Sequence, residues 1–153
     1  MAEEHLNAVA AVERACFGGD AWPRRVFVRL LEAYRGSVGV RGELWVAVDE
    51  RTGRVLGYVG LDANGLGDAE LISLAVRRRW RRRGVGRELV SFVIDACRKL
   101  DVALLWLRVR RSNAAAVRFY AACGFNVRGE FRAYYDDPRE DAIIMAREVP
   151  AIE

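Results

Sequence analysis

The stretch AELISLAVRRRWRRRGVGRELV, residues Ala69–Val90, joins three local patterns. It opens with an apolar run, continues through six arginines in seven positions, and ends in alternating glycines followed by a new apolar period. A short apolar run with a β-branched residue is typical of a buried strand. Apolar residues at helical spacing after the glycines indicate an amphipathic helix. The stretch therefore predicts a strand, a short basic loop and a helix N-terminus.

The loop between these two elements has the chemistry of an anion site. Gly84 and Gly86 remove Cβ atoms where a ligand would approach the backbone. The first turn of the next helix presents unpaired N–H groups and the positive end of its dipole at the same place. The alternative is a purely structural turn with solvated arginines. The loop is neither a P-loop, since no Gly-Lys-Ser/Thr follows, nor a Rossmann GxGxxG turn.

Charge outside this loop argues against a nucleic-acid-binding protein. The 153 residues carry a net charge of +4, so without the six arginines of the loop the rest of the chain is net −2. A protein that coats nucleic acid usually spreads positive charge over a face or a tail. The length fits one domain, residues 1–153.

Cysteine usage and hydropathy point to a soluble cytoplasmic protein. Cys16, Cys97 and Cys123 are an odd number without CxxC spacing, which disfavours a disulfide framework and a metal site. The acidic N-terminus is unlike a signal peptide, and no apolar run approaches the ~20 residues of a membrane span. The sequence does not indicate an oligomeric state.

Periodicity and turn residues predict two helices, two strands, a strand and a helix, a second strand and helix, and two final strands. The expected helices are 5–17, one beginning near Pro23, 85–100, and Ala114–Cys123 capped by Asn113; the expected strands lie within 43–63, at Ala69–Val76, and at 102–109, 125–135 and 141–149. This order predicts an α/β (α+β) fold with one mixed sheet and helices on both faces.

Four ordered motifs resemble the GNAT superfamily of N-acetyltransferases. RRRGVG (Arg81–Gly86) matches its Arg/Gln-x-x-Gly-x-Gly/Ala motif. LLWLRVRRSNAAAVRFYAACGF (Leu104–Phe125), EDAIIMA (Glu140–Ala146) and VERACFGGDAWPRRVF (Val12–Phe27) resemble the RimI-like branch, which acetylates protein N-termini. The resemblance implies the GNAT fold, with a mostly antiparallel sheet, although the family's opening strand is missing or very short here.

The resemblance also implies acetyl-CoA as the acetyl donor, with coenzyme A as product. Backbone groups of Leu74, Ala75 and Val76 are expected to pair with the pantetheine arm. The residues expected at the pyrophosphate are Arg81, Arg82, Arg83, Gly84, Val85, Gly86 and Arg87. Asn113 matches an asparagine that bonds the cofactor arm, although N-capping alone explains it equally.

Two residues are candidates for proton transfer. Tyr120 matches the family's general acid at the coenzyme A sulfur, with a core aromatic as the alternative. The branch's usual glutamate base is replaced by Arg108, which cannot accept a proton. Glu70 opens the buried strand where another GNAT branch carries its base, so we expect Glu70 to serve here. The alternative is a structural Glu70–Arg108 ion pair.

The acceptor side is expected to include Trp22, Phe27, Arg108, Tyr134 and Tyr135. Core packing is the alternative for the four aromatic residues, and Arg108 is expected to orient Glu70 or a substrate carbonyl. The predicted function is acetyl transfer to the α-amine of a protein or peptide, with a ribosomal protein as one candidate. Two alternatives remain: acetylation of a small amine or lysine side chain, and a non-catalytic acyl-CoA sensor.

Overall fold

The computed structural model describes residues 1–36 and 41–152. Its elements follow the predicted order, and their ends differ from the expected ones by a few residues, as is usual at frayed termini. The helices are η1 (Glu3–His5), α1 (Leu6–Phe17), η2 (Gly18–Asp20), α2 (Arg24–Gly36), η3 (Arg78–Trp80), α3 (Val85–Lys99) and α4 (Ala114–Ala122). The strands are β1 (Arg41–Val48), β2 (Val55–Ala63), β3 (Asp68–Val76), β4 (Leu104–Arg110), β5 (Asn126–Asp136) and β6 (Arg139–Glu148). Within the described residues no strand precedes α1, as the sequence indicated.

The six strands form one sheet in the order β1-β2-β3-β4-β6-β5. Every neighbouring pair is antiparallel except β3 and β4, which run parallel. The α/β fold class with a mixed, mostly antiparallel sheet is therefore confirmed.

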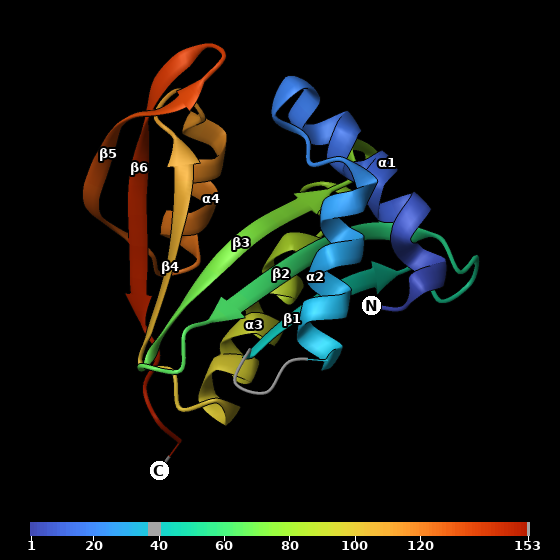
Figure 1. The fold of residues 1–153 in the computed structure, drawn as a ribbon, viewed down its shortest axis with the longest axis horizontal. Helices are drawn as coiled ribbons and strands as arrows, with labels where there is room; N and C mark the ends of the chain where they lie inside the picture. Colours follow the sequence, from blue (N-terminus) through green and yellow to red (C-terminus); the bar gives the residue numbers. More distant parts are fainter. Residues whose placement is uncertain (37–40, 153) are drawn as a thin grey trace.

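The parallel pair at the centre of the sheet is short. Strands β3 and β4 are paired only where Asp68–Glu70 meets Leu104–Trp106. Beyond this segment they separate, and the sheet opens into a V (Figure 1). In β3, Ser73 faces Gly60 and Leu71 faces Leu61, so Ile72 is an extra residue in the ladder. Such a bulge bends its strand and increases the local twist, which turns β3 away from β4.

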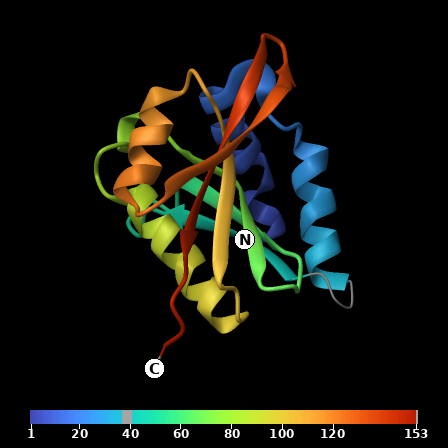
Figure 2. The same ribbon diagram turned by 90° about the vertical axis from the view of Figure 1, so that its left-hand side faces the viewer.

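Helices cover both faces of this sheet (Figure 2). We call the side covered by α1 and α2 the α1–α2 face, and the opposite side the α3–α4 face. Each side has its own apolar core. The α3–α4 core contains Val59, Leu61, Val93, Leu105 and Phe125, and the α1–α2 core contains Val9, Val12, Phe27, Leu44 and Tyr58.

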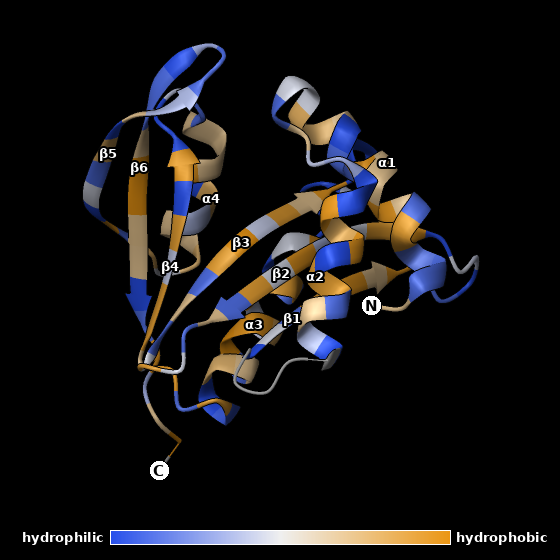
Figure 3. Ribbon diagram, viewed as in Figure 1, coloured by the Kyte–Doolittle hydropathy of each residue, from blue (hydrophilic) through white to orange (hydrophobic). Residues whose placement is uncertain are grey.

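Hydropathy follows this layering (Figure 3). Strand β2 is buried at almost every position, which explains its continuous apolar sequence. The β5–β6 tip, in contrast, is strongly hydrophilic (Figure 3). Among the described helices none is long and apolar enough to cross a membrane.

Candidate active site

The arginine–glycine loop lies at the open end of the V, where β3 ends and α3 begins. Gly84 is the N-cap of α3 with a φ of +84°, and a Cβ built there would meet no atom within 4 Å. The first intrahelical bond runs from Glu88 N to Gly84 O. The N–H groups of residues 82–87 have no backbone acceptor among the described residues. Consecutive free N–H groups at a helix N-terminus make an anion-binding nest.

Two residues of this loop, Arg81 and Gly86, have structural roles that the sequence did not indicate. Arg81 donates from Nε to Val76 O at 3.0 Å and from Nη2 to Cys16 Sγ at 3.3 Å, so its guanidinium braces the loop. A Cβ on Gly86 would lie 3.0 Å from the Phe119 ring of α4. The missing Cβ of Gly86 therefore makes room for the aromatic ring, and its contact with the pyrophosphate stays a prediction.

The inner edge of β3 has free backbone groups beside this nest. Leu74, Ala75 and Val76 pair with β2 on one side, while β4 has already separated on the other. In an antiparallel ladder, alternate backbone groups point away from the paired strand. The outward groups of Leu74 and Ala75 therefore face the split between β3 and β4 and are available to an extended ligand, whereas Val76 O already accepts hydrogen bonds from Arg81 and Cys16.

The two proton-transfer candidates lie on opposite faces of the sheet. In β4, Leu105 and Leu107 enter the α3–α4 core, so the alternating Arg108 points to the α1–α2 face. Glu70 points the same way because its neighbours Ala69 and Leu71 belong to the α3–α4 core. Tyr120, from α4, packs within the α3–α4 core. Glu70 thus lies on the α1–α2 face at the start of the split, and Tyr120 belongs to the core on the opposite face.

Glu70 and Arg108 form an ion pair across the start of the split. Arg108 Nε and Nη2 both donate to Oε1 of Glu70, at 2.9 and 2.6 Å. Among the described residues Oε2 of Glu70 has no hydrogen bond, so one carboxylate oxygen remains free to accept a proton. The Arg108 guanidinium lies 4.8 Å from the centre of the Tyr134 ring, which holds it from the other side.

Burial raises the pKa of Glu70 above its ordinary value, and the hydrogen bonds and charge of Arg108 oppose that rise. Asp62, which faces Glu70 on the neighbouring strand β2, adds to it. Burial also raises the pKa of Tyr120, which is 8% exposed, so its phenol stays protonated at neutral pH. These directions suit a carboxylate that accepts a proton and a phenol that gives one.

Asn113 caps α4, since its Oδ1 accepts a hydrogen bond from Ala116 N at 3.1 Å. The capping interpretation is confirmed, and a bond to the cofactor arm stays a prediction. Tyr120 packs edge-on against Phe119 and Phe125, at 5.2 and 5.6 Å between ring centres. It is therefore a core residue, as the alternative had it, and its role as the acid stays a prediction.

The aromatic residues expected at the acceptor side divide into two groups. Tyr134 is 44% exposed and stacks edge-on with Tyr135 at 4.9 Å, and both lie over arginines at the end of β4. Phe27 is fully buried between Trp22 and Tyr58. The expectation that Phe27 shapes the pocket mouth was wrong, because its side chain is fully buried.

A model of the Acetyltransferase (GNAT) family matches residues 6–125 of the chain. The chain belongs to the GNAT acetyltransferase family. An uncharacterized N-acetyltransferase of Methanocaldococcus jannaschii is 32% identical over an alignment of 156 positions that covers 98% of this chain and 90% of that protein.

Two further comparisons are with a ribosomal-protein alanine N-acetyltransferase. The [ribosomal protein bS18]-alanine N-acetyltransferase of Escherichia coli K12 is 49% identical over 83 residues, which is 53% of this GNAT chain and 56% of that protein. That match spans little more than half of either protein. The crystal structure of the Escherichia coli ribosomal-protein-S18-alanine N-acetyltransferase superposes with a TM-score of 0.80 and 30% identity over 100% of this chain and 93% of that one. The resemblance to the RimI-like branch is thus confirmed.

Sequence analysis of this GNAT chain missed a buried polar network beside the site. Glu13 is 2% exposed and accepts hydrogen bonds from Trp22 N, at 2.9 Å, and from the Tyr58 hydroxyl. The Tyr58 hydroxyl also bonds Ser73 Oγ at 2.7 Å. A signal was present, because Glu13 falls on the apolar stripe of α1, four residues after the buried Val9. A charged residue on a buried helix face indicates a polar partner inside.

Proposed function

We propose that this chain transfers the acetyl group of acetyl-CoA directly to the N-terminal α-amine of a protein or peptide. The observation that carries the proposal is the split between β3 and β4, with an anion nest at its open end, Glu70 on one face and Tyr120 on the other. The named activity of the Escherichia coli relatives supports the same reaction. We place the activity in the cytoplasm, where ribosomal proteins are made.

The residues around the split fit acetyl-CoA. A pyrophosphate needs several N–H donors without competing acceptors, and the nest of residues 82–87 supplies them. A pantetheine arm needs an unpaired strand edge, which Leu74 and Ala75 provide. When bound, acetyl-CoA supplies an acetyl group activated as a thioester.

Glu70 acts as the general base in this proposal. The acceptor amine approaches from the α1–α2 face and loses a proton to the free Oε2 of Glu70, directly or through water. An α-amine has a pKa near 7.7–8.0, so roughly a tenth of it is already neutral at pH 7. This neutral amine attacks, and Glu70 removes the one proton that the nitrogen must lose as the C–N bond forms. Arg108 positions the carboxylate by holding its other oxygen.

Tyr120 completes the exchange from the opposite face. As the C–N bond forms and the C–S bond breaks, the phenol donates its proton to the leaving thiolate. Both Glu70 and Tyr120 then recover their starting protonation states from solvent. The proposal assigns Tyr134, Tyr135 and Trp22 to the acceptor.

The test uses two short peptides with acetyl-CoA and mass-spectrometric detection. One begins with a free alanine, the residue named for the Escherichia coli relative. The other is blocked at its N-terminus and carries a lysine. We expect turnover of the first peptide only, because a lysine amine, with a pKa near 10.4, is harder to deprotonate. Turnover of the blocked peptide would favour a lysine or small-amine acetyltransferase, and no turnover with tight acetyl-CoA binding would favour a sensor.

A further inference from the structure

The corner between α1 and α2 is held in place from inside the molecule. Residues Gly18–Asp20 form the short helix η2, and Trp22 follows two residues later. The Trp22 N–H is bonded to the buried Glu13. Because it lies in the low-dielectric interior, this bond is stronger than the same bond would be in water. The corner therefore has a fixed position relative to α1 and to β2.

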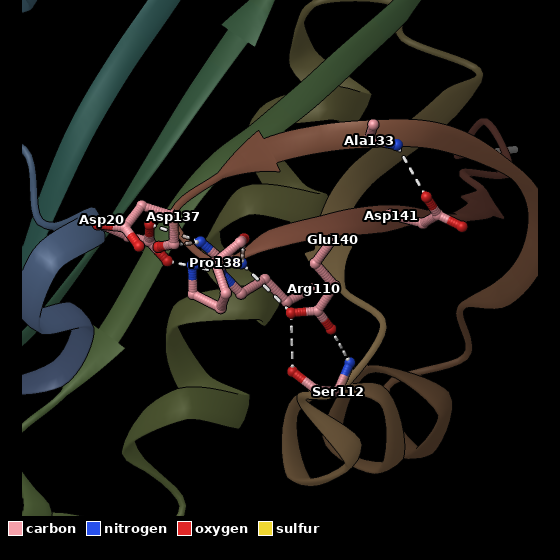
Figure 4. A network of polar contacts seen from close by, with 8 residues as sticks. All are labelled: Asp20, Arg110, Ser112, Ala133, Asp137, Pro138, Glu140 and Asp141. Carbon is pink, nitrogen blue, oxygen red and sulfur yellow. Dashed lines mark hydrogen bonds and ion pairs between the residues drawn. The ribbon is translucent and has the colours of Figure 1, made fainter.

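The same corner is held from outside by Arg110, the last residue of β4 (Figure 4). Arg110 Nε donates to Asp20 Oδ2 at 2.6 Å, and Nη2 donates to Asp20 Oδ1 at 2.7 Å, in a bidentate fork. Arg110 also donates to the carbonyls of Asp137 and Pro138, at 3.2 and 3.0 Å, and to Glu140. One side chain thus joins the corner, the end of β4 and the β5–β6 turn.

These contacts close a ring around the split on the α1–α2 face. Pairing of Glu70 with Trp106 closes one end. At the other end, Cys16 Sγ reaches Val76 O at 3.5 Å, and the chain then runs through η2 to Asp20. In order, the ring consists of Glu70–Val76, Cys16–Asp20, and Arg110 back to Trp106. The Asp20–Arg110 pair is the link between its two halves at the open end.

The pair also contacts the acceptor aromatics. The Arg110 guanidinium lies 4.2 Å from the centre of the Tyr135 ring, which stacks on Tyr134. Tyr134 in turn lies over Arg108, the partner of Glu70. A continuous series of contacts therefore connects Asp20 to the carboxylate assigned as the base.

We propose that Asp20 and Arg110 are a positioning pair that closes the acceptor entrance and fixes the corner and the β5–β6 turn on either side of the incoming peptide. The proposal rests on the proposed function, because it assigns the acceptor to the α1–α2 face. Asp20 does not touch the reacting atoms, so its loss should weaken acceptor binding more than chemistry. The pair positions the segments that bind the peptide before the reaction. Loss of the pair should therefore weaken peptide binding and raise the peptide KM.

The test measures peptide KM and kcat for Asp20→Asn at saturating acetyl-CoA. The amide keeps the shape of Asp20 but loses the charge and one acceptor of the fork. We expect the peptide KM to rise roughly fivefold, as for loss of a well-formed ion pair, with kcat within about twofold of wild type. Asp20→Glu should recover most of the loss. The control is Asp95→Asn, which breaks the 2.8 Å Asp95–Arg98 pair on α3.

A second measurement requires no turnover, so it remains decisive if the proposed function fails. Amide hydrogen exchange should be faster in Asp20→Asn at the corner, residues 18–22, and at the β5–β6 tip, while Asp95→Asn leaves both as in wild type. Such paired loosening supports the positioning role. Unchanged exchange at both segments, or a peptide KM equal to or lower than that of wild type, would overturn it.

Discussion

Glu70 is the last β3 residue paired with β4, and Arg108 lies two residues beyond the paired segment on β4. The pair therefore spans the point where the strands begin to separate. The RimI-like branch places a glutamate where this chain has Arg108, and an arginine cannot accept a proton. The carboxylate stands instead on the neighbouring strand, with one oxygen held and the other free. Under the proposed function, the base is thus a carboxylate on the other side of the split.

Arg108→Met tests this assignment through pH. Arg108 lowers the pKa of Glu70 against the rise caused by burial, so its removal should raise that pKa further. A base works when deprotonated, and the acidic limb of the kcat/KM profile should therefore move to higher pH. The α-amine of the peptide titrates independently of the variant. An acidic limb at the wild-type position would mean that Glu70 is not the group that titrates.

At the scale of elements, the sequence indicated the strand–loop–helix unit because the continuous apolar run of the strand differs clearly from the helical spacing of apolar residues that follows it. The split could not be predicted, since periodicity identifies strands but does not give the register that makes Ile72 a bulge. The sequence left the Glu70–Arg108 ion pair open as an alternative. Both residues lie in predicted strands, but the pattern alone does not show that these strands are neighbours. Asp20 and Arg110 are 90 residues apart, in a turn and at a strand end, and no local pattern connects them.

Substitutions at the two glycines of the loop should separate ligand binding from packing. Gly84→Val places a side chain where the structure has no other atom, at the mouth of the nest. The positive φ of residue 84 costs a non-glycine residue roughly 1–2 kcal/mol. We expect the substitution to abolish acetyl-CoA binding in calorimetry while the protein stays folded. Gly86→Ala should instead lower the melting temperature, because its Cβ would press on the Phe119 ring. Wild-type acetyl-CoA affinity in Gly84→Val would contradict the pyrophosphate site.

The buried Glu13 should make stability depend on pH. Burial raises its pKa above the ordinary value of about 4.5, although hydrogen bonds from Trp22 and Tyr58 oppose the rise. A carboxyl whose pKa is higher folded than unfolded stabilises the protein below that ordinary value, and this stabilisation is lost as pH rises through the folded pKa. Glu13→Gln stays neutral, accepts from Trp22 N and donates to Tyr58.

Denaturant unfolding between pH 4 and pH 8 checks this expectation. The stability of Glu13→Gln relative to wild type should increase as pH rises above about 4.5. Glu32→Gln, which changes an exposed carboxylate on α2, serves as the control. A constant difference between Glu13→Gln and wild type over this range would contradict the raised pKa.

The whole molecule is a sheet opened at its centre, with one helix pair on each side of the opening. Because β3 and β4 are parallel, their carboxyl ends lie together at the open end, where the nest of α3 and the α1–α2 corner also meet. In the proposed mechanism the donor sulfur lies toward Tyr120 and the acceptor amine toward Glu70. In this account acetyl-CoA and the acceptor amine meet within the split. Glu70 therefore affects the rate of acetyl transfer but not the affinity for acetyl-CoA.

The most direct test is the single-turnover rate of α-amine acetylation by Glu70→Gln beside wild type, on one alanine-initiated peptide at saturating acetyl-CoA. The amide keeps the size of the side chain and cannot accept the proton. The account predicts a rate roughly 10²–10⁴ lower than that of wild type, with the affinity for acetyl-CoA unchanged. A wild-type rate in Glu70→Gln would contradict the account, because the proton would then leave by another path and Glu70 would only pair with Arg108.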